Sequence, residues 1–298
     1  MEVSQKQKIG VFFALAAFGF WGLVPIYFKA VQHVPPLNIL CHRVVWSVPF
    51  TAALITIGRQ WGSLREALGV SRVLGTLFLS ATLVAFNWFV FIYAITTNRV
   101  IHASLGYFIN PLVNVLLGMV FLRERLGRWQ TLAVLLAAAG TLNLTIGQGQ
   151  LPWISLALAF SFGFYGLLRK TVRIESLNGL FVETSLLFPF AFAYLAFAAW
   201  KGVGAFGTVN WQTTLLLALA GAITSAPLVW FTSAARKLRY STIGLLQYVA
   251  PSLQFMLAVY LYKEPFTVAH QVTFGFIWTG LAIFMADSLY KQGRYQGS

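Results

Sequence analysis

Polar side chains that can form hydrogen bonds interrupt several long apolar stretches of this chain. In LGYFINPLVN, residues 105–114, an asparagine and a proline stand in the middle of an apolar run. At 100° per residue, Tyr107, Asn110 and Asn114 fall within about 60° of one another, on one narrow stripe of a helix. Unpaired amides in hydrocarbon are costly. The spacing predicts either the lining of a solute cavity or hydrogen bonds between helices.

A matching stripe occurs 140 residues later in the chain. LLQYVAPSLQ, residues 245–254, places Gln247 and Gln254 on one face of a second helix. Pro111 and Pro251 stand at equivalent points, and each lacks the N–H that would bond four residues back, so we expect both helices to kink. We expect the two stripes to face each other or to line a wet cavity. Interhelical hydrogen bonding without a cavity is the alternative.

Four further side chains in the middle of apolar stretches are candidates for the wall of such a cavity. Trp21 and Tyr165 stand between glycines at equivalent points of FGFWGL and FGFYGL, residues 18–23 and 162–167. Asn87 is a candidate hydrogen-bond donor, and Trp88 follows it directly. For the three aromatic side chains, interior packing is as good an explanation as a cavity wall.

Arg43 and Glu183 are related by the same shift of 140 residues but carry opposite charges. Each lies about six residues inside its expected span, from opposite ends, so at 1.5 Å per residue roughly 12 Å separates them vertically. Each therefore needs its own partner or an aqueous vestibule. Glu183 is the only acidic residue well inside an expected span, which makes it the candidate proton carrier. Arg43 and His102 are the other candidates for charge coupling.

The elements that position these residues are membrane-spanning helices. The chain is 58% hydrophobic and 9% charged, whereas soluble domains are about 25% charged. A helix crossing about 30 Å of hydrocarbon needs roughly 20 apolar residues. Stretches of this length predict an all-α polytopic protein of ten spans: 9–28, 37–57, 72–94, 100–122, 127–146, 152–170, 177–200, 212–235, 241–262 and 267–288.

The net charge of +14 follows from topology. Sixteen of the 21 Lys and Arg residues fall in alternate connections or at the two termini. By the positive-inside rule, these connections and both termini face the cytoplasm. Basic residues spread between spans do not form the single solvated face that nucleic acid needs, so nucleic acid is excluded as a partner. The lipid bilayer is the expected environment.

The two halves of the chain resemble each other. A single shift of 140 residues matches Asn38 with Asn178, Pro49 with Pro189 and Glu124 with Glu264. The pattern divides one membrane domain into five-helix repeats at 1–147 and 148–298. Because five is odd, the second copy lies inverted in the membrane. Inverted repeats are typical of secondary transporters, in which the halves rock around a site near the midplane.

Three motifs give the chain a family resemblance. NWFVFIYA at 87–94, LGYFINPL at 105–112 and FLRERL at 121–126, together with the two-fold pattern, resemble the RarD branch of the EamA-type drug/metabolite transporters (DMT superfamily). The resemblance implies a bacterial inner-membrane permease with a central cavity built from the first, third and fourth helices of each half. Arg43 matches the arginine common in the second helix of EamA repeats. Glu183 departs from that pattern in the second repeat.

These observations predict a permease or exporter that moves a small organic metabolite or drug-like solute by alternating access. Protons or a counter-substrate are open as coupling partners. A passive channel and a non-transporting membrane scaffold are the alternatives. The chain lacks HExxH, GxSxG and phosphate-binding glycine motifs, so we expect no enzyme, cofactor or metal site. Cys41 is the only cysteine, which rules out an intrachain disulfide.

Overall fold

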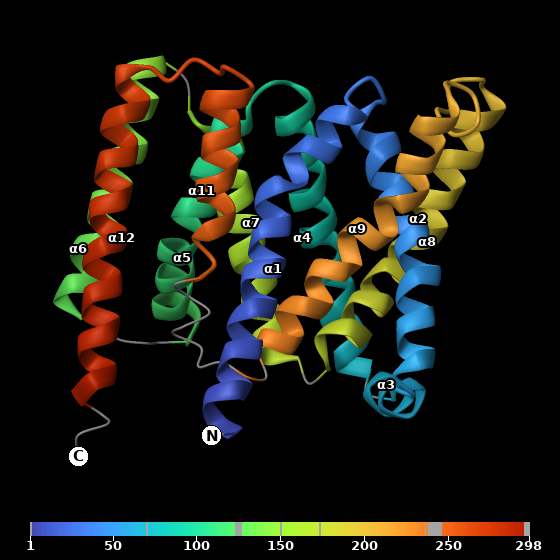
Figure 1. Cartoon of the computed structure of the whole chain (residues 1–298), viewed down its shortest axis with the longest axis horizontal. Helices are drawn as coiled ribbons and strands as arrows, with labels where there is room; N and C mark the ends of the chain where they lie inside the picture. Colours follow the sequence, from blue (N-terminus) through green and yellow to red (C-terminus); the bar gives the residue numbers. More distant parts are fainter. Residues whose placement is uncertain are drawn as a thin grey trace.

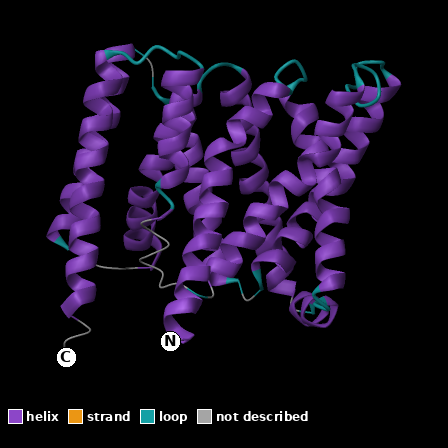
Figure 2. Ribbon diagram, in the orientation of Figure 1, coloured by secondary structure: helices purple, strands orange, loops and turns teal. Residues whose placement is uncertain are grey.

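The computed structural model describes residues 2–69, 71–122, 127–149, 151–172, 174–235, 237 and 246–294. All regular structure in these residues is helical (Figure 2). The helices are α1 (Glu2–Ala30), α2 (Pro36–Ile57), α3 (Trp61–Leu68), α4 (Ser71–Thr96), α5 (Val100–Leu122), α6 (Arg128–Gln148), α7 (Trp153–Thr171), α8 (Ser176–Trp200), α9 (Trp211–Ala235), α11 (Val249–Met256), the π-helix η1 (Leu257–Leu261) and α12 (Val268–Arg294). The sequence prediction of an all-helical protein is confirmed.

The expected spans coincide with these helices to within a few residues, except at two places. The ninth span, 241–262, is described only from residue 246, where α11 and η1 form its second part. The short helix α3 was not expected. Among the described residues, five helices are individually long and apolar enough to cross a membrane, namely α1, α2, α4, α8 and α9, and α5 is a sixth if its two bent parts form one span.

The helices stand side by side in one bundle (Figure 1). α6 and α12 form one edge, α2 and α8 form the opposite edge, and the other long helices lie between them. The start of α1 and the end of α12 lie at the same face of the bundle, which we call the amino-terminal face. The first polar stripe is carried by α5, and the second by α11 and the turn before it, both in the middle region.

Most of the close helix packing joins the first half of the chain to the second. α1 packs on α9 and α11, and α7 packs in the same way on α4 and α5. α2 packs on α8, α6 packs on α12, and α5 meets α11. Each of these pairs connects a helix that ends by residue 148 with one that begins after it. The two halves are therefore interleaved rather than placed side by side as separate bundles.

Glycines allow two of these crossings to be close. A Cβ added at Gly106 of α5 would lie 2.8 Å from the carbonyl oxygen of Ser155 on α7. A Cβ added at Gly22 of α1 would lie 2.7 Å from the Cβ of Leu253 on α11. Small residues at membrane helix crossings let backbones approach until their polar groups are within reach of neighbouring side chains. The close approach brings the carbonyls of α7 and α1 to the polar stripes.

The two prolines of the stripes act differently. α5 bends by about 40° between Asn110 and Leu112, so the kink expected at Pro111 is present. The kink expected at Pro251 stays a prediction, because most of the helix that would precede it falls on residues outside the described ones. α11 begins at Val249, which puts Pro251 in its first turn, where the missing N–H breaks no intrahelical bond. Residues 238–245, which would carry the helix further back, lie outside the described residues.

Candidate functional site

Two buried asparagines tie the first half of the chain to α7. Asn110 on α5 donates from Nδ2 to the carbonyl oxygen of Ala159 at 3.0 Å. Asn87 on α4, 1% exposed, donates from Nδ2 to the carbonyl oxygen of Leu158 at 3.0 Å and to Ser161 Oγ at 2.9 Å. Both amides thus bond the backbone of the first helix of the second half. Such bonds hold helices together in an apolar environment.

The rest of the first stripe extends this hydrogen-bonded row. The Tyr107 hydroxyl lies 3.5 Å from Asn87 Oδ1, to which it donates. Asn114 donates from Nδ2 to Asn110 Oδ1 at 3.2 Å. Tyr107 is half-buried and Asn114 is exposed. The row therefore runs from buried amides that join helices to side chains with free surface.

The second stripe makes the corresponding contact with α1. Gln254 is buried and donates from Nε2 to the carbonyl oxygen of Trp21 at 3.1 Å. Its Oε1 atom has no hydrogen-bond partner among the described residues. Gln247 is half-buried in the turn before α11. The Trp21 ring is also half-buried and packs against Phe231 of α9, with ring centroids 5.9 Å apart.

The two stripes do not face each other as the sequence suggested. Each meets the first helix of the opposite half, because the glycine crossings bring the backbone carbonyls of α7 and α1 within reach of the amides. α5 and α11 still touch, through a hydrogen bond of 2.8 Å from Ser104 Oγ to the carbonyl oxygen of Pro251. The amides are therefore paired across the interface of the two halves.

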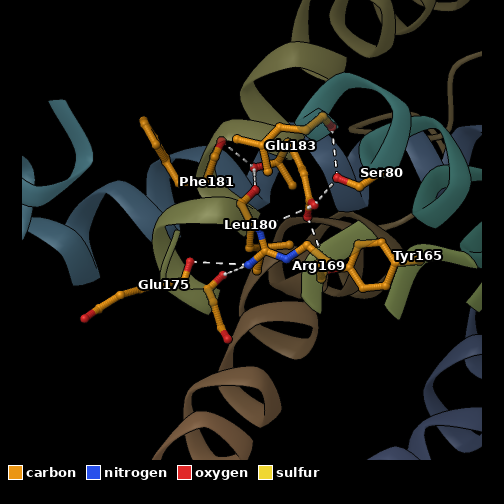
Figure 3. Close-up of polar contacts among 10 residues, drawn as sticks. Ser80, Tyr165, Arg169, Glu175, Leu180, Phe181 and Glu183 are labelled. Carbon is orange, nitrogen blue, oxygen red and sulfur yellow. Dashed lines mark hydrogen bonds and ion pairs between the residues drawn. The ribbon is translucent and has the colours of Figure 1, made fainter. Parts of the chain in front are cut away.

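A cluster of charged and polar side chains surrounds Glu183, which is fully buried (Figure 3). Ser80 of α4 donates from Oγ to Glu183 Oε1 at 2.6 Å, and the Tyr165 hydroxyl of α7 donates to Oε2 at 3.3 Å. Arg169 Nη1 lies 3.8 Å from Oε1. We call Ser80, Tyr165, Arg169 and Glu183 the Glu183 cluster. It joins α4, α7 and α8 near the amino-terminal face.

Arg169 also binds the backbone at the start of α8. Its Nη2 atom donates to the carbonyl oxygens of Glu175 at 3.3 Å and Ser176 at 3.4 Å. A Cβ at Gly179 would overlap the guanidinium, so this glycine leaves the space that Arg169 occupies. Protonation of Glu183 would remove its attraction to Arg169 and with it the electrostatic link between α7 and α8.

Arg43 occupies a separate site near the opposite face of the bundle. Its guanidinium carbon lies 4.0 Å from the centroid of the Trp88 ring and 5.9 Å from that of Phe28. The hydroxyls of Tyr27 and Tyr107 are its electrostatic neighbours. We call Tyr27, Phe28, Arg43, Trp88 and Tyr107 the Arg43 site. These residues come from α1, α2, α4 and α5, the first four spans of the first half.

The structure keeps the two repeat-related charges apart. Glu183 pairs with Arg169, and no ion pair of Arg43 occurs among the described residues. Trp88, which covers Arg43, belongs to a buried apolar cluster against which Tyr165 packs. Tyr165 in turn bonds Glu183. Aromatic side chains therefore fill the space between the two charged sites.

His102, the third coupling candidate, lies in the first turn of α5. Its ring makes an edge contact with the His270 ring of α12, with centroids 5.7 Å apart. Its backbone carbonyl accepts a hydrogen bond of 2.7 Å from Ser155 Oγ. His102 Nδ1 has no partner in the described part of the chain. None of these contacts brings it into the Glu183 cluster or the Arg43 site.

Sequence reasoning missed several polar residues that complete these sites. Arg169 is one of the basic residues counted at the cytoplasmic ends of the spans, but its spacing of four residues from Tyr165 places both on one helix face. Ser80 gave no signal beyond being a small polar residue in an apolar stretch. Glu264 was noted only as a repeat match. Its oxygens accept hydrogen bonds from the backbone N–H groups of Val100 at 2.7 Å and Ile101 at 2.9 Å, so it caps α5.

Comparisons with known proteins agree with this architecture. Residues 8–146 match the EamA-like transporter family. The chain is 47% identical to Protein RarD of Salmonella typhi over 294 residues, covering 99% of this chain and 100% of that protein. The chain belongs to the RarD branch of the EamA-like transporters. An uncharacterized transporter of Vibrio cholerae serotype O1 is also 47% identical, over 96% of this chain and 94% of that protein.

Membership of the EamA-like family fixes the general class of the protein. A chain in a solved crystal structure, 18% identical, superposes with a TM-score of 0.55 over 93% of this chain and 97% of its own length, which shows a shared fold. The EamA-like chain described here is a bacterial multi-pass inner-membrane protein and a membrane transporter of the drug/metabolite kind. The branch inferred from the three sequence motifs is confirmed.

Proposed function

We propose that this protein is a secondary transporter that moves a small organic solute by alternating access. In this proposal, residues 1–147 and 148–298 are inverted five-helix repeats that rock against each other. The observation that carries the proposal is the reciprocal packing of the halves. The first helix of each half, α1 or α7, packs on the third and fourth helices of the other half. A solute path along α1 and α7 would then be lined by helices of both halves.

The side chains with free surface along this path define the solute site. Trp21, Tyr107 and Tyr165 are half-buried on α1, α5 and α7. Asn87, Asn110 and Gln254 hold the helices behind them by bonding backbone carbonyls. Rings with one polar end suit an amphipathic organic solute better than an inorganic ion.

Glu183 is the proposed coupling residue. It is a buried carboxylate held by one arginine and two hydroxyls from α4 and α7. Binding a proton would weaken its pairing with Arg169 and loosen α8 from α7. Ionisable groups inside membrane proteins commonly serve such relays. Whether protons or a counter-substrate drive the cycle is decided by replacing Glu183 with Gln, which should uncouple transport from a pH gradient while leaving solute exchange.

A disulfide lock tests alternating access without a known substrate. On a Cys41→Ser background, Tyr107→Cys is labelled with a membrane-impermeant maleimide in right-side-out and inside-out vesicles. We expect labelling from both sides, because both states are visited. Gly22→Cys with Leu253→Cys joins α1 to α11, whose backbones must part by roughly 1 Å to bring a Cβ separation of 2.7 Å into the range of a disulfide. Once this disulfide forms, Tyr107→Cys should be labelled in only one of the two vesicle orientations. Reduction of the disulfide should restore labelling in the other orientation.

A matched pair at the edge of the bundle controls for the effect of a disulfide itself. Gly147→Cys with Ala269→Cys joins α6 to α12, where an added Cβ at Gly147 would lie 2.8 Å from Ala269 Cβ. This lock is remote from α1 and α7 and should leave labelling from both sides. Labelling from both sides through the locked α1 and α11 would indicate a channel. Labelling from neither side in any variant would indicate a scaffold.

A further inference from the structure

We infer that Arg43 binds a carboxylate of the solute, so that the protein carries an organic acid with an apolar body. This inference rests on the proposed transport function and adds a substrate class to it. The Arg43 site provides a cation with no counterion among the described residues, beside an aromatic wall and two hydroxyls.

The first step is that the charge of Arg43 is unmatched. The chain has seven acidic residues. Among those whose side chains are described, Glu183 pairs with Arg169 and Glu264 caps α5. The electrostatic neighbours of Arg43 are tyrosine hydroxyls rather than carboxylates. Its Nε atom is buried, and no described residue accepts a hydrogen bond from it.

The second step is that Arg43 points inward. It is the eighth residue of α2, which begins at Pro36, so it lies roughly 10 Å from the end of that helix. A long cationic side chain near a membrane surface normally extends its charge toward water. Here the guanidinium carbon instead lies 4.0 Å from the centroid of the Trp88 ring, in the interior of α4. An unpaired charge held in this way is costly, which favours a partner supplied from outside the chain.

The third step concerns the shape of that partner. The guanidinium carbon lies over the Trp88 ring, 4.0 Å from its centroid. The N–H groups of a guanidinium form a planar fork that matches a carboxylate. Both neighbouring hydroxyls already donate their protons, Tyr27 to the carbonyl oxygen of Leu216 at 2.9 Å and Tyr107 to Asn87 Oδ1 at 3.5 Å. Because these protons are already engaged, the N–H groups of Arg43 are the donors available to the acid. Phe28 and Trp88 offer apolar surface for the body of the acid.

Two probes that differ only in charge test the inference. The purified full-length protein is unfolded thermally in detergent with increasing phenylacetate or phenylacetamide, and acetate and indole-3-acetate extend the series. A ligand that binds the folded state raises the apparent Tm in a saturable way. We expect phenylacetate and indole-3-acetate to raise Tm and phenylacetamide to leave it unchanged. Equal effects of the acid and the amide, or no effect of any acid, would overturn the inference.

Arginine variants then locate the binding. Arg43→Gln should abolish the difference between phenylacetate and phenylacetamide. Arg99→Gln is the matched control, because Arg99 is exposed after α4 and contacts Tyr93 instead of the Arg43 site. It should bind phenylacetate as the unaltered protein does. If Arg43→Gln does not fold, Arg43→Lys decides the matter. It keeps the charge but loses the fork, and its affinity for phenylacetate should fall about tenfold.

The outcomes separate this inference from the transport proposal. If Arg43→Gln or Arg43→Lys binds phenylacetate as tightly as the unaltered protein, Arg43 does not bind the carboxylate. This result would overturn the inference even if the maleimide experiment shows alternating access. Acid-specific binding that depends on Arg43, in a protein labelled from both sides despite the lock, would support the site and contradict the carrier mechanism.

Discussion

Removing one charge from the Glu183 cluster leaves the other without its partner. Glu183 is 0% and Arg169 13% exposed through their side chains. Breaking a buried pair from one side typically costs on the order of 3 kcal/mol, whereas removing both charges costs much less. We expect Arg169→Gln to lower stability by about that amount and Arg169→Gln with Glu183→Gln to recover most of it. Thermal unfolding in detergent measures both, and a double variant as unstable as the single one would contradict the expectation.

Glu264 stabilises the first turn of α5 through two backbone hydrogen bonds. Glu264→Ala leaves the N–H groups of Val100 and Ile101 without this acceptor, which should lower stability by about 1–2 kcal/mol. Glu264→Gln keeps one oxygen acceptor and should cost less. The same unfolding assay compares the two variants. Equal losses would show that the carboxylate charge, rather than hydrogen bonding, stabilises this helix end.

The pH dependence at Glu264 has a definite sign. Burial raises the pKa of its carboxyl above the ordinary value of 4.5, although the N–H groups of Ile101 and Val100 and the charge of Lys29 act in the opposite direction. A raised pKa means that the folded protein binds the proton more tightly. The contribution is therefore complete below pH 4.5 and is lost as the pH rises through the folded pKa. Relative to Glu264→Gln, the Tm of the unaltered protein should fall as pH rises across this window.

At the scale of residues, the sequence located charges but not all of their partners. The depths of Arg43 and Glu183 in the membrane follow from residue counts along their two helices. The sequence alone therefore predicts that these two side chains do not form an ion pair. The partnership of Glu183 with Arg169 depends on how the last turn of α7 packs beside α8. Such packing directions are tertiary, and periodicity along one helix does not contain them.

At the scale of elements, close helix crossings make individual glycines sensitive. A Cβ on Gly221 of α9 would overlap the main chain of Trp46 on α2. The two helices would have to separate, so we expect Gly221→Ala to destabilise the protein by about 1–3 kcal/mol. Gly75→Ala is the control, because nothing lies within 4 Å of its added Cβ. It should be neutral or stabilise by roughly 0.5–1 kcal/mol through helix propensity. Similar losses in both variants would contradict the crossing argument.

The sequence predicts the presence of a long helix more reliably than it predicts where that helix bends or begins. Apolar stretches of sufficient length identified the long helices because the bilayer sets a minimum length. The bend at Pro111 followed from a missing N–H inside a continuous helix. Pro251 has the same local chemistry, yet α11 begins two residues before it. Where a helix starts depends on the neighbours of its first turn, so the start of α11 was not predictable from the repeat alone.

At the scale of the whole molecule, the arrangement of charges makes a prediction about sidedness. The start of α1 and the end of α12 lie at one face of the bundle. The connection that carries Arg59 and Arg65 leads through α3 at this same face, whereas the turn between α1 and α2 lies at the opposite one. Positive charge near short connections is retained in the cytoplasm. We therefore expect the amino-terminal face to be cytoplasmic.

Single cysteines on the Cys41→Ser background measure this sidedness in intact cells. Gln32→Cys lies in the turn between α1 and α2, and Gln60→Cys lies between α2 and α3. A membrane-impermeant maleimide should label position 32 in intact cells and position 60 only after the membrane is opened. The reverse pattern would place the Glu183 cluster toward the outside and the Arg43 site toward the cytoplasm. In an exporter of the proposed kind, Glu183 releases its proton to the cytoplasm and the solute leaves past Arg43 to the outside. This mechanism requires that position 32 is labelled in intact cells and position 60 is not. The labelling therefore also shows which charged site faces which compartment.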